Sequence, residues 1–413
     1  MTSYQPNPVV TFADVNVYSQ NTIANISINM GRDDVLDQPQ AGYARIVLWT
    51  DASEPLNVNL SDSVTVAIDN GTAGSSTIFT GIISDIDISL ARFGDVGSVA
   101  EYTLTAVGPL AQLNKRTAGA SNYAKEFDGT RILNILTDAF LTAWDDVGTT
   151  LTWNDLPNDV TWASYDGVNE TLVNNLATTI DVPGQFELEA YNDGVANAYT
   201  LADIAAQSGR GVLYEAGNGH LHYGDYASRA GQTPLDLTAD DLLTDGLSTA
   251  AQWSEIVNDA EVTYRAGSEF ARDEQSVILY GQLTGSRDTV LHNASDALQQ
   301  AEDFITSRAY PRVYPNNLTI ALHNPEVSDA TRDALIAAEN GTEVITSSLP
   351  AVFGTNFNGF IEGYTWNLTR YEAVITLICS AVSETYPHII WYQIPPTTTW
   401  SSYTPNTDTW SDL

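Results

Sequence analysis

Short runs of alternating apolar and polar residues dominate the first 112 positions of the chain. A period of two predicts half-buried β-strands, because successive side chains of a strand point to opposite faces. Gly, Asn, Asp and Pro separate the runs, a spacing typical of antiparallel sandwiches and small barrels. The expected strands are Val15–Val17, Ile23–Ile28, Ala44–Trp49, Val64–Ile68, Ile78–Ile88 and Glu101–Val107.

The periodicity becomes helical after residue 113. Asp128 can cap a helix whose apolar stripe runs from Ile132 to Ala143. Two further helices are expected over Glu170–Thr178 and, capped by Thr200, over Leu201–Ala206. Within residues 211–223, Asn218-Gly219 predicts the tight turn of a hairpin. These patterns indicate a separate α+β unit.

Strand-like runs return beyond Leu242. The Asp-rich segment Asp236–Asp245 favours a turn with a solvated face. One helix is expected at Ala294–Ser307. The expected strands are Ile256–Tyr264, Ser276–Tyr280, Leu318–Leu322, Thr342–Ile345, Phe360–Leu368 and Ala373–Cys379.

The two ends of the chain echo each other. The segment Phe79-Thr-Gly leads into a strand and a return strand at residues 101–107, and Phe357-Asn-Gly leads in the same way to residues 373–379. Each pair follows two earlier strands, 44–49 and 64–68 in the first half, 318–322 and 342–345 in the second. In this order, the segments predict two related β domains flanking the α+β unit.

The fold class predicted from these patterns is α+β and mostly β. It comprises two related antiparallel barrel or sandwich domains around an insert. The predicted domains are a tube-like β domain at 1–112, an α+β insert at 113–240, a second β domain with one helix at 241–385, and an extended Trp-, Pro- and Thr-rich tail at 386–413.

The chain is strongly acidic, with 52 Asp and Glu against 16 Lys and Arg, a formal charge of −36. This balance excludes a docking surface for nucleic-acid phosphates. It is compatible with a conduit that repels the DNA passing through it. It is equally compatible with a surface that is only soluble, or with a salt-adapted host.

The candidate chemistry is sparse. The single cysteine, Cys379, excludes an intramolecular disulfide, and we expect no leader and no membrane insertion because no apolar run approaches 20 residues. His220 and His222 share a strand face near Asp225, a spacing compatible with a metal but more typical of a solvated hairpin. Walker, Cys-x-x-Cys, His-Glu-x-x-His, Gly-x-Ser-x-Gly and EF-hand patterns are absent. We therefore expect no catalysis, no cofactor and no metal.

The stretch Gly31–Gly42 (GRDDVLDQPQAG) delivers a strand through a polar connector. Read with Phe79–Ile86, residues 211–223, Tyr280-Gly281 and Phe357–Gly363, it resembles the minor tail proteins of long-tailed actinobacterial phages. The likeness spans most of residues 10–380 and rests on the order of these segments.

The resemblance implies a tail hub, or baseplate hub, in the virion tail tip, made in the host cytoplasm. It implies a homotrimer in which two barrel-like domains per chain adapt the six-fold tail tube to a three-fold tip. The implied partners are the distal tail protein or tail tube, the tape measure protein, and a central fibre or other tip protein. DNA would pass through the channel during ejection without specific binding.

Two sets of residues are candidate contacts within such an assembly. In the connector and its strand, subunit contacts are expected at Arg32, Asp33, Asp34, Asp37 and Arg45, and replacing both arginines with Ala is expected to weaken the ring but leave the monomer folded. In the tail, aromatic anchors for a partner are expected at Trp391, Trp400 and Trp410, although a composition rich in Pro and Thr is also typical of disorder.

Two other functions stay open. A host-glycan-binding tail protein would use aromatic residues of the insert, such as Trp153, Trp162 and Tyr165, which ordinary core packing explains equally well. A cell-wall hydrolase is the weaker alternative, since no catalytic pair stands out among so many acids.

Overall fold

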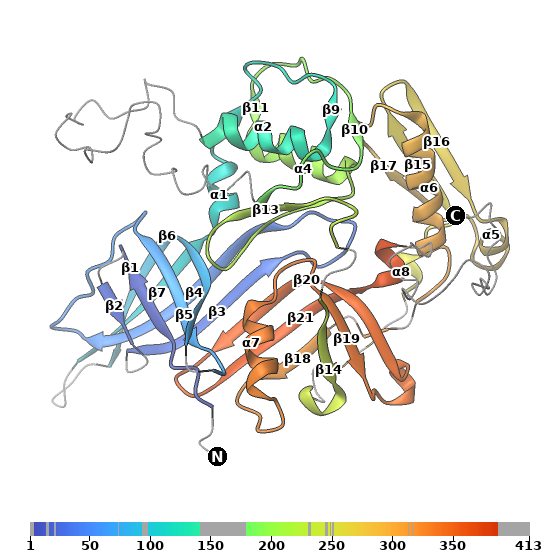
Figure 1. The fold of residues 1–413 in the computed structure, drawn as a ribbon. Coiled ribbons are helices and arrows are strands. Elements are labelled where there is room, and N and C mark those ends of the chain that lie inside the picture. Colours follow the sequence, from blue (N-terminus) through green and yellow to red (C-terminus); the bar gives the residue numbers. More distant parts are fainter. Residues whose placement is uncertain are drawn as a thin grey trace.

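The computed structural model describes most of residues 4–386. Two hydrophobic cores organise these residues, one inside a large β-sheet and one in a smaller α+β body beside it (Figure 1). No helix in the described part is long and apolar enough to span a bilayer. The described residues exclude 14–15, 20–21, 73, 93–97, 141–178, 230–232, 244–246, 248, 250–251, 313 and 316.

The N-terminal half of the large sheet is antiparallel. Its strands alternate buried and partly exposed positions, so that one face packs into the first core. In spatial order it runs β3-β4-β7-β6-β5-β1-β2. The strands are β1 (Val9–Phe12), β2 (Asn16–Tyr18), β3 (Ile23–Gly31), β4 (Gln40–Asp51), β5 (Ser63–Asp69), β6 (Ser75–Arg92) and β7 (Val99–Val107).

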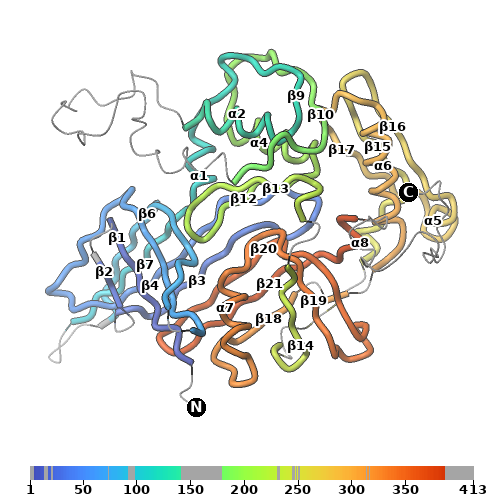
Figure 2. The backbone as a smooth tube through the Cα atoms, in the orientation of Figure 1, coloured from blue at the N-terminus to red at the C-terminus, as the bar shows by residue number. Residues whose placement is uncertain are grey.

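The C-terminal half continues the same sheet, because β20 pairs with β3 through residues 363–368. β20 also pairs with β19 through residues 356–360, and with β21 along most of its length. Figure 2 shows the two halves side by side. The elements are β14 (Leu235–Thr238), β18 (Asn317–Ala321), α7 (Asp329–Ala337), β19 (Glu343–Ser347), β20 (Asn356–Leu368), β21 (Ala373–Ala381) and α8 (Val382–Thr385).

The predicted internal repeat is present in the strand pairing. In the first half, β4 pairs with β7, β7 with β6, and β6 with β5. In the second half, β18 pairs with β21, β21 with β20, and β20 with β19. All six pairs are antiparallel, so one chain contains the same four-stranded unit twice.

The second core belongs to an α+β body that covers one end of the sheet. Asn197, not Thr200, caps α4, since its Oδ1 accepts from Thr200 N at 3.0 Å. The helices are α1 (Pro109–Leu113), α2 (Asp128–Phe140), α4 (Ala198–Ser208), α5 (Glu274–Tyr280) and α6 (Ala294–Arg308). The strands are β8 (Thr117–Ala118), β9 (Glu126–Phe127), β10 (Glu187–Leu188), β11 (Ala196–Asn197), β12 (Val212–Glu215), β13 (Leu221–Gly224), β15 (Asp259–Tyr264), β16 (Gly267–Arg272) and β17 (Thr284–Arg287).

The predicted boundary at residues 240/241 does not follow the cores. Residues of β15 and α6 pack in the second core with α2 and α4, whereas Leu235 and Leu237 of β14 pack in the first. The chain therefore leaves the α+β body, adds β14 to the sheet, and returns to the body before completing the sheet. The expected single helix of 241–385 is accompanied in the structure by α5, α7 and α8.

Two elements differ in type from the sequence prediction. Ser276–Tyr280 was expected as a strand but lies in α5, because Asp273 caps the helix by accepting from Ser276 N at 2.9 Å. The Asp-rich segment at 236 was expected as a solvated turn. Its alternate leucines are buried instead, and β14 pairs in parallel with β19. A local cap thus decides the first case, and burial with strand pairing decides the second.

Candidate functional site

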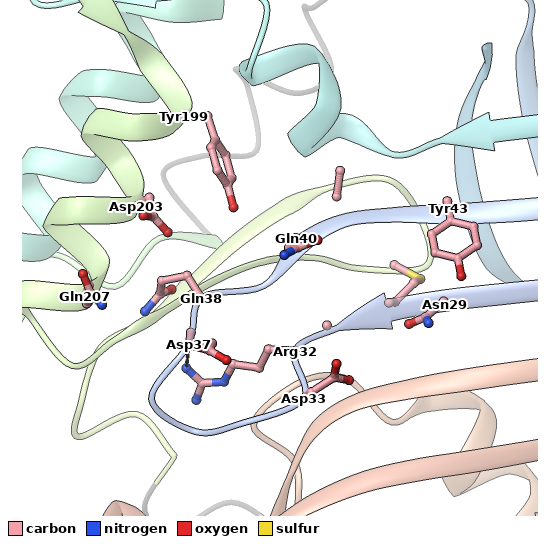
Figure 3. A pocket seen from close by; sticks show the side chains of 13 residues that line it. Asn29, Arg32, Asp33, Asp37, Gln38, Gln40, Tyr43, Tyr199, Asp203 and Gln207 are labelled. Carbon is pink, nitrogen blue, oxygen red and sulfur yellow. Dashed lines mark hydrogen bonds between the residues drawn. The ribbon is translucent and has the colours of Figure 1, made fainter. Parts of the chain in front are cut away.

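The polar connector between β3 and β4 enters the junction of the sheet and the α+β body (Figure 3). Asp34 closes its turn, accepting from Leu36 N at 2.8 Å through Oδ1 and from Asp37 N at 3.1 Å through its carbonyl. Arg32 N donates to the Glu362 carbonyl at 2.9 Å, which fixes the start of the connector to β20. This Asx turn and the Arg32 hydrogen bond place the connector beside a strand 330 residues away.

A buried ion-pair network lies under the connector. Arg32 Nη2 is 2.5 Å from Glu362 Oε2, and Arg229 Nη1 is 2.7 Å from Glu362 Oε1. Ser380 Oγ also donates to this carboxylate. Burial alone would raise the pKa of Glu362, but Arg229, Arg32 and these hydrogen bonds hold it well below its usual range. Glu362 is therefore a buried, charged residue within the apolar part of β20.

Further arginines connect the same connector to the surrounding helices. Arg308 at the end of α6 donates to both carboxylate oxygens of Asp34, at 2.9 and 3.1 Å. Arg312 pairs with Glu384 of α8, and Arg210 pairs with Asp303 of α6. These contacts join the connector, the sheet and the α+β body into one buried junction.

An open polar cavity of about 510 Å³ lies on the other side of the connector. Tyr199, Asp203 and Gln207 of α4 point into it from one wall, and the connector and the start of β4 form the other (Figure 3). Tyr199 Oη donates to the Pro39 carbonyl at 3.0 Å across the cavity. Burial, and then the nearby carboxylate of Asp37, raise the pKa of Asp203. The cavity is polar, and it is acidic because three aspartates and one arginine line it.

The hairpin β12–β13 lies across the two halves of the sheet. Glu215 accepts hydrogen bonds from Gly42 N and, at 3.0 Å, from Leu110 N. Since none of the described cations pairs with this carboxylate, burial raises the pKa of Glu215 to about 7. At the turn, Thr80 Oγ1 of β6 donates to the Gly217 carbonyl at 3.0 Å.

Of the two histidines of this hairpin, His222 packs against other side chains of the protein. His222 stacks near the Tyr214 ring at 5.2 Å and lies 3.8 Å from Glu339 Oε2. Burial lowers the pKa of His222, which keeps the imidazole neutral. Within the described residues, no three His, Cys, Asp or Glu side chains gather in a geometry that would hold a metal.

The predicted contact residues of the connector do not share one environment. Asp33 and Asp37 are exposed, Asp34 is half-buried, and Arg45 is exposed on β4. Arg32 is only 7% exposed and lies within the chain's own junction, so its replacement acts on the fold of the monomer. We therefore expect loss of Arg32 to destabilise the monomer as well, unlike the expectation drawn from the sequence. A subunit contact at the exposed members stays a prediction, and the tail tryptophans Trp391, Trp400 and Trp410 lie outside the described residues.

Sequence reasoning missed the partners that make the junction. Glu362 interrupts the apolar run Gly359-Phe-Ile-Glu-Gly363, and a lone acid in a buried strand signals a paired charge. Arg229 and Arg287 carried no such signal, because the residues around them read as loop.

One face of the large sheet is polar across both halves. A row in register crosses it from Asp85 of β6 to Asn367 of β20, and every side chain in the row is exposed or half-buried. A second row crosses the same face and ends on β18. The first row is Asp85, Thr105, Arg45, Ser27 and Asn367, and the second is Tyr43, Asn29, Thr365, Thr376 and Thr319.

The fold of this chain is similar to that of several solved structures. No family model matches the chain, and no curated protein is similar to it in sequence. The 43 kDa tail protein of prophage MuSo2 from Shewanella oneidensis is similar in structure, with a TM-score of 0.59, 11% identity, and coverage of 92% of this chain and 98% of that one. A tail protein from Neisseria meningitidis has a TM-score of 0.58 and 13% identity, covering 93% and 99%. A prophage tail protein, gp18, from Listeria monocytogenes has a TM-score of 0.50 and 12% identity, covering 91% and 95%.

These likenesses cover 91 to 93% of this chain. They confirm the predicted α+β, mostly β fold class. The link to actinobacterial phages in particular stays a prediction, since these three structures come from other bacteria. The chain has the fold of prophage tail proteins.

Proposed function

We propose that this chain is a structural, non-enzymatic subunit of a phage-type tail, located in the tail tip. Three copies form a ring that adapts a six-fold tail tube to a three-fold tip. The similarity in fold to three prophage tail proteins supports the tail assignment.

The repeated four-stranded unit carries the ring proposal. A six-fold tube presents six equivalent contacts, and a trimer can match them only if each chain offers two similar surfaces. The units β4-β7-β6-β5 and β18-β21-β20-β19 have the same order and the same antiparallel pairing. Both belong to one continuous sheet through the β3–β20 pair, which fixes their relative position within the chain.

The polar face of the sheet is the proposed lining of the channel. Hydroxyl and amide side chains dominate its rows, and Asp85 and Asp87 stand exposed at the β6 end. Such a surface offers DNA phosphates few cations to bind, and the acids repel them. Tape measure protein and DNA would therefore pass without specific retention. The tail tube or distal tail protein above, and a central fibre or other tip protein below, complete the proposed assembly.

The far half of β6 is the proposed edge for contacts between subunits. Beyond Ile83, β6 pairs only with β7 among the described strands, so its other edge is open. Ile88 and Leu90 are 62% and 63% exposed there. An open edge with apolar side chains favours pairing with another chain.

The native mass of the purified chain tests this proposal. We expect a trimer by light scattering and rings by negative-stain microscopy, alone or after addition of tail tube protein. Leu90→Asp is expected to lower the assembled fraction at the open edge, whereas Val352→Asp, at an equally exposed valine of the C-terminal half, is the matched control. A monomer that ignores the tube protein, or equal losses in both variants, would contradict the proposal.

Retention of the chain on host cell-wall polysaccharide, without rings, would favour the glycan-binding alternative instead. The aromatic residues on which that alternative depends, Trp153, Trp162 and Tyr165, lie outside the described residues. Clearing in a host peptidoglycan zymogram would favour a wall hydrolase.

A further inference from the structure

The buried junction contains more positive than negative charge. Six of the chain's 14 arginines gather there, in a protein whose formal charge is −36. Among the described residues, four carboxylates form ion pairs with them, those of Asp34, Asp303, Glu362 and Glu384. The arginines are Arg32, Arg210, Arg229, Arg287, Arg308 and Arg312.

The excess charge is localised. Arg210 has Asp303, and Arg308 and Arg312 have Asp34 and Glu384, so these pairs are neutral overall. Arg32 and Arg229 share the single carboxylate of Glu362. That arrangement leaves one positive charge uncompensated among the three side chains.

The second uncompensated positive charge belongs to Arg287, at the end of β17. Its Nη2 donates to the Leu36 carbonyl at 3.1 Å, and its guanidinium lies 5.9 Å from the centre of the Phe304 ring, but no carboxylate of the described residues forms an ion pair with it. Burial, followed by the positive charges of Arg210 and Arg32, lowers the pKa of Arg287 to about 10. The guanidinium of Arg287 is thus buried close to other positively charged side chains.

A small cavity of about 30 Å³ lies between these side chains. Four guanidinium groups line it, and the only carboxylate in its lining, Glu384, is the one that already faces Arg312 and Arg308. This volume is enough for a water molecule or a monatomic ion. Guanidinium groups around a space of this size form a donor set for an anion.

We propose that this cavity binds a small inorganic anion, of which chloride is the best-sized example, held by Arg32, Arg229 and Arg287. The anion neutralises part of the charge that burial makes unfavourable. It thereby stabilises the junction of the connector, the sheet and the α+β body. This site is independent of the proposed tail function, because it is enclosed within one chain.

Thermal unfolding in increasing sodium chloride tests the site, with sodium gluconate, whose anion is too large for the cavity, keeping the ionic strength constant. Anion binding to the native state raises the unfolding temperature in a saturable way, here by roughly 2 °C or more. Arg287→Gln removes one cation of the site and is expected to abolish the rise. Arg370→Gln, at an exposed arginine in the turn between β20 and β21, is expected to behave as the parent protein.

General salt effects act equally on all three proteins, so the difference between them is the result that matters. An equal chloride response in Arg287→Gln and in the parent protein would overturn the proposal. Crystals of the unaltered protein grown in sodium bromide provide a second measurement that needs no variant. An anomalous peak between Arg32, Arg229 and Arg287 supports the site, and no peak there overturns it.

Discussion

The two four-stranded units have the same strand pairing, but they differ in the residue at the register shift of the third strand. In each unit, a Phe-x-Gly segment lies in the third strand, and a Cβ on the glycine would lie within 3.0 Å of the preceding Phe ring and of a neighbouring carbonyl. Three residues after each glycine, the register against the return strand shifts, at Ser84 in the first unit and at Glu362 in the second.

The residue at the bulge determines whether a unit is tied to the buried junction. Ser84 is exposed, and its Oγ donates to Asp85 Oδ2 at 2.8 Å. Glu362 is 1% exposed and binds two arginines from distant segments. A bulge re-aims one side chain, while pairing resumes on either side of it, so a repeat can acquire a junction on one copy and leave the other copy without one.

Among the substitutions that test this comparison, we expect the largest loss of stability at Glu362. Glu362→Gln leaves Arg32 and Arg229 buried without a counter-charge and is expected to destabilise the protein by roughly 3 to 5 kcal/mol. The equivalent Ser84→Ala is expected to stay within about 0.5 kcal/mol. Urea unfolding gives the free energy of unfolding of both variants. Similar losses of stability would show that the two bulges are equivalent.

The shared glycines should respond alike. Gly81→Ala and Gly359→Ala each force a Cβ against a Phe ring and a carbonyl of the adjacent strand, in Val107 and Ser380 respectively. We expect each to cost roughly 1 to 3 kcal/mol, as overpacked core positions do. Unfolding midpoints that differ strongly between the two variants would argue against a repeat at the level of side-chain packing.

The two buried carboxylates that join the sheet to its surroundings should respond oppositely to pH. Glu215 has a raised pKa, about 7, so its favourable contribution is complete below its unfolded value and is lost as the pH rises through 7. Glu362 has a lowered pKa, so its contribution is present above the unfolded value and is lost on acidification below about 4.5.

Glu215→Gln isolates the first of these effects. Stability of the parent protein minus that of the variant should fall between pH 5 and pH 8, with a slope of at most about 1.4 kcal/mol per pH unit. Other buried acids, such as Asp128 with its pKa raised by burial to about 6, cancel in this difference. A flat difference across this range would show that Glu215 is ionised throughout.

The smallest effect is expected at Arg45, the exposed counterpart of Arg32. Arg45→Ala should leave the unfolding midpoint of the monomer unchanged, because the side chain lies on the polar face of the sheet. Any loss it causes should appear in the native mass of the ring. A folded monomer with an intact ring would remove Arg45 from the proposed subunit contacts.

The repeat could be predicted from sequence because its signals are local. Alternation, turn residues and the Phe-x-Gly segments locate β4 to β7 and β18 to β21 to within a few residues. The short segment of α5 was ambiguous for the same reason, since seven residues with a run of apolar side chains fit either a strand or a helix.

The junction could not be predicted in the same way. Arg32 and Glu362 are 330 positions apart, and nothing local marks them as partners. The scarcity of cations suggested that the connector's arginine matters. Only the structure shows that it matters inside the monomer.

The β3–β20 pair also sets an order of events during synthesis. The edge of β3 that β20 covers emerges from the ribosome about 330 residues before its partner. At typical elongation rates this delay is roughly 15 to 70 s. For that time the nascent chain carries an open sheet edge, which its own C-terminal half later covers. Premature termination within the last strands would thus release a chain whose N-terminal half is folded but whose β3 edge is still open to aggregation.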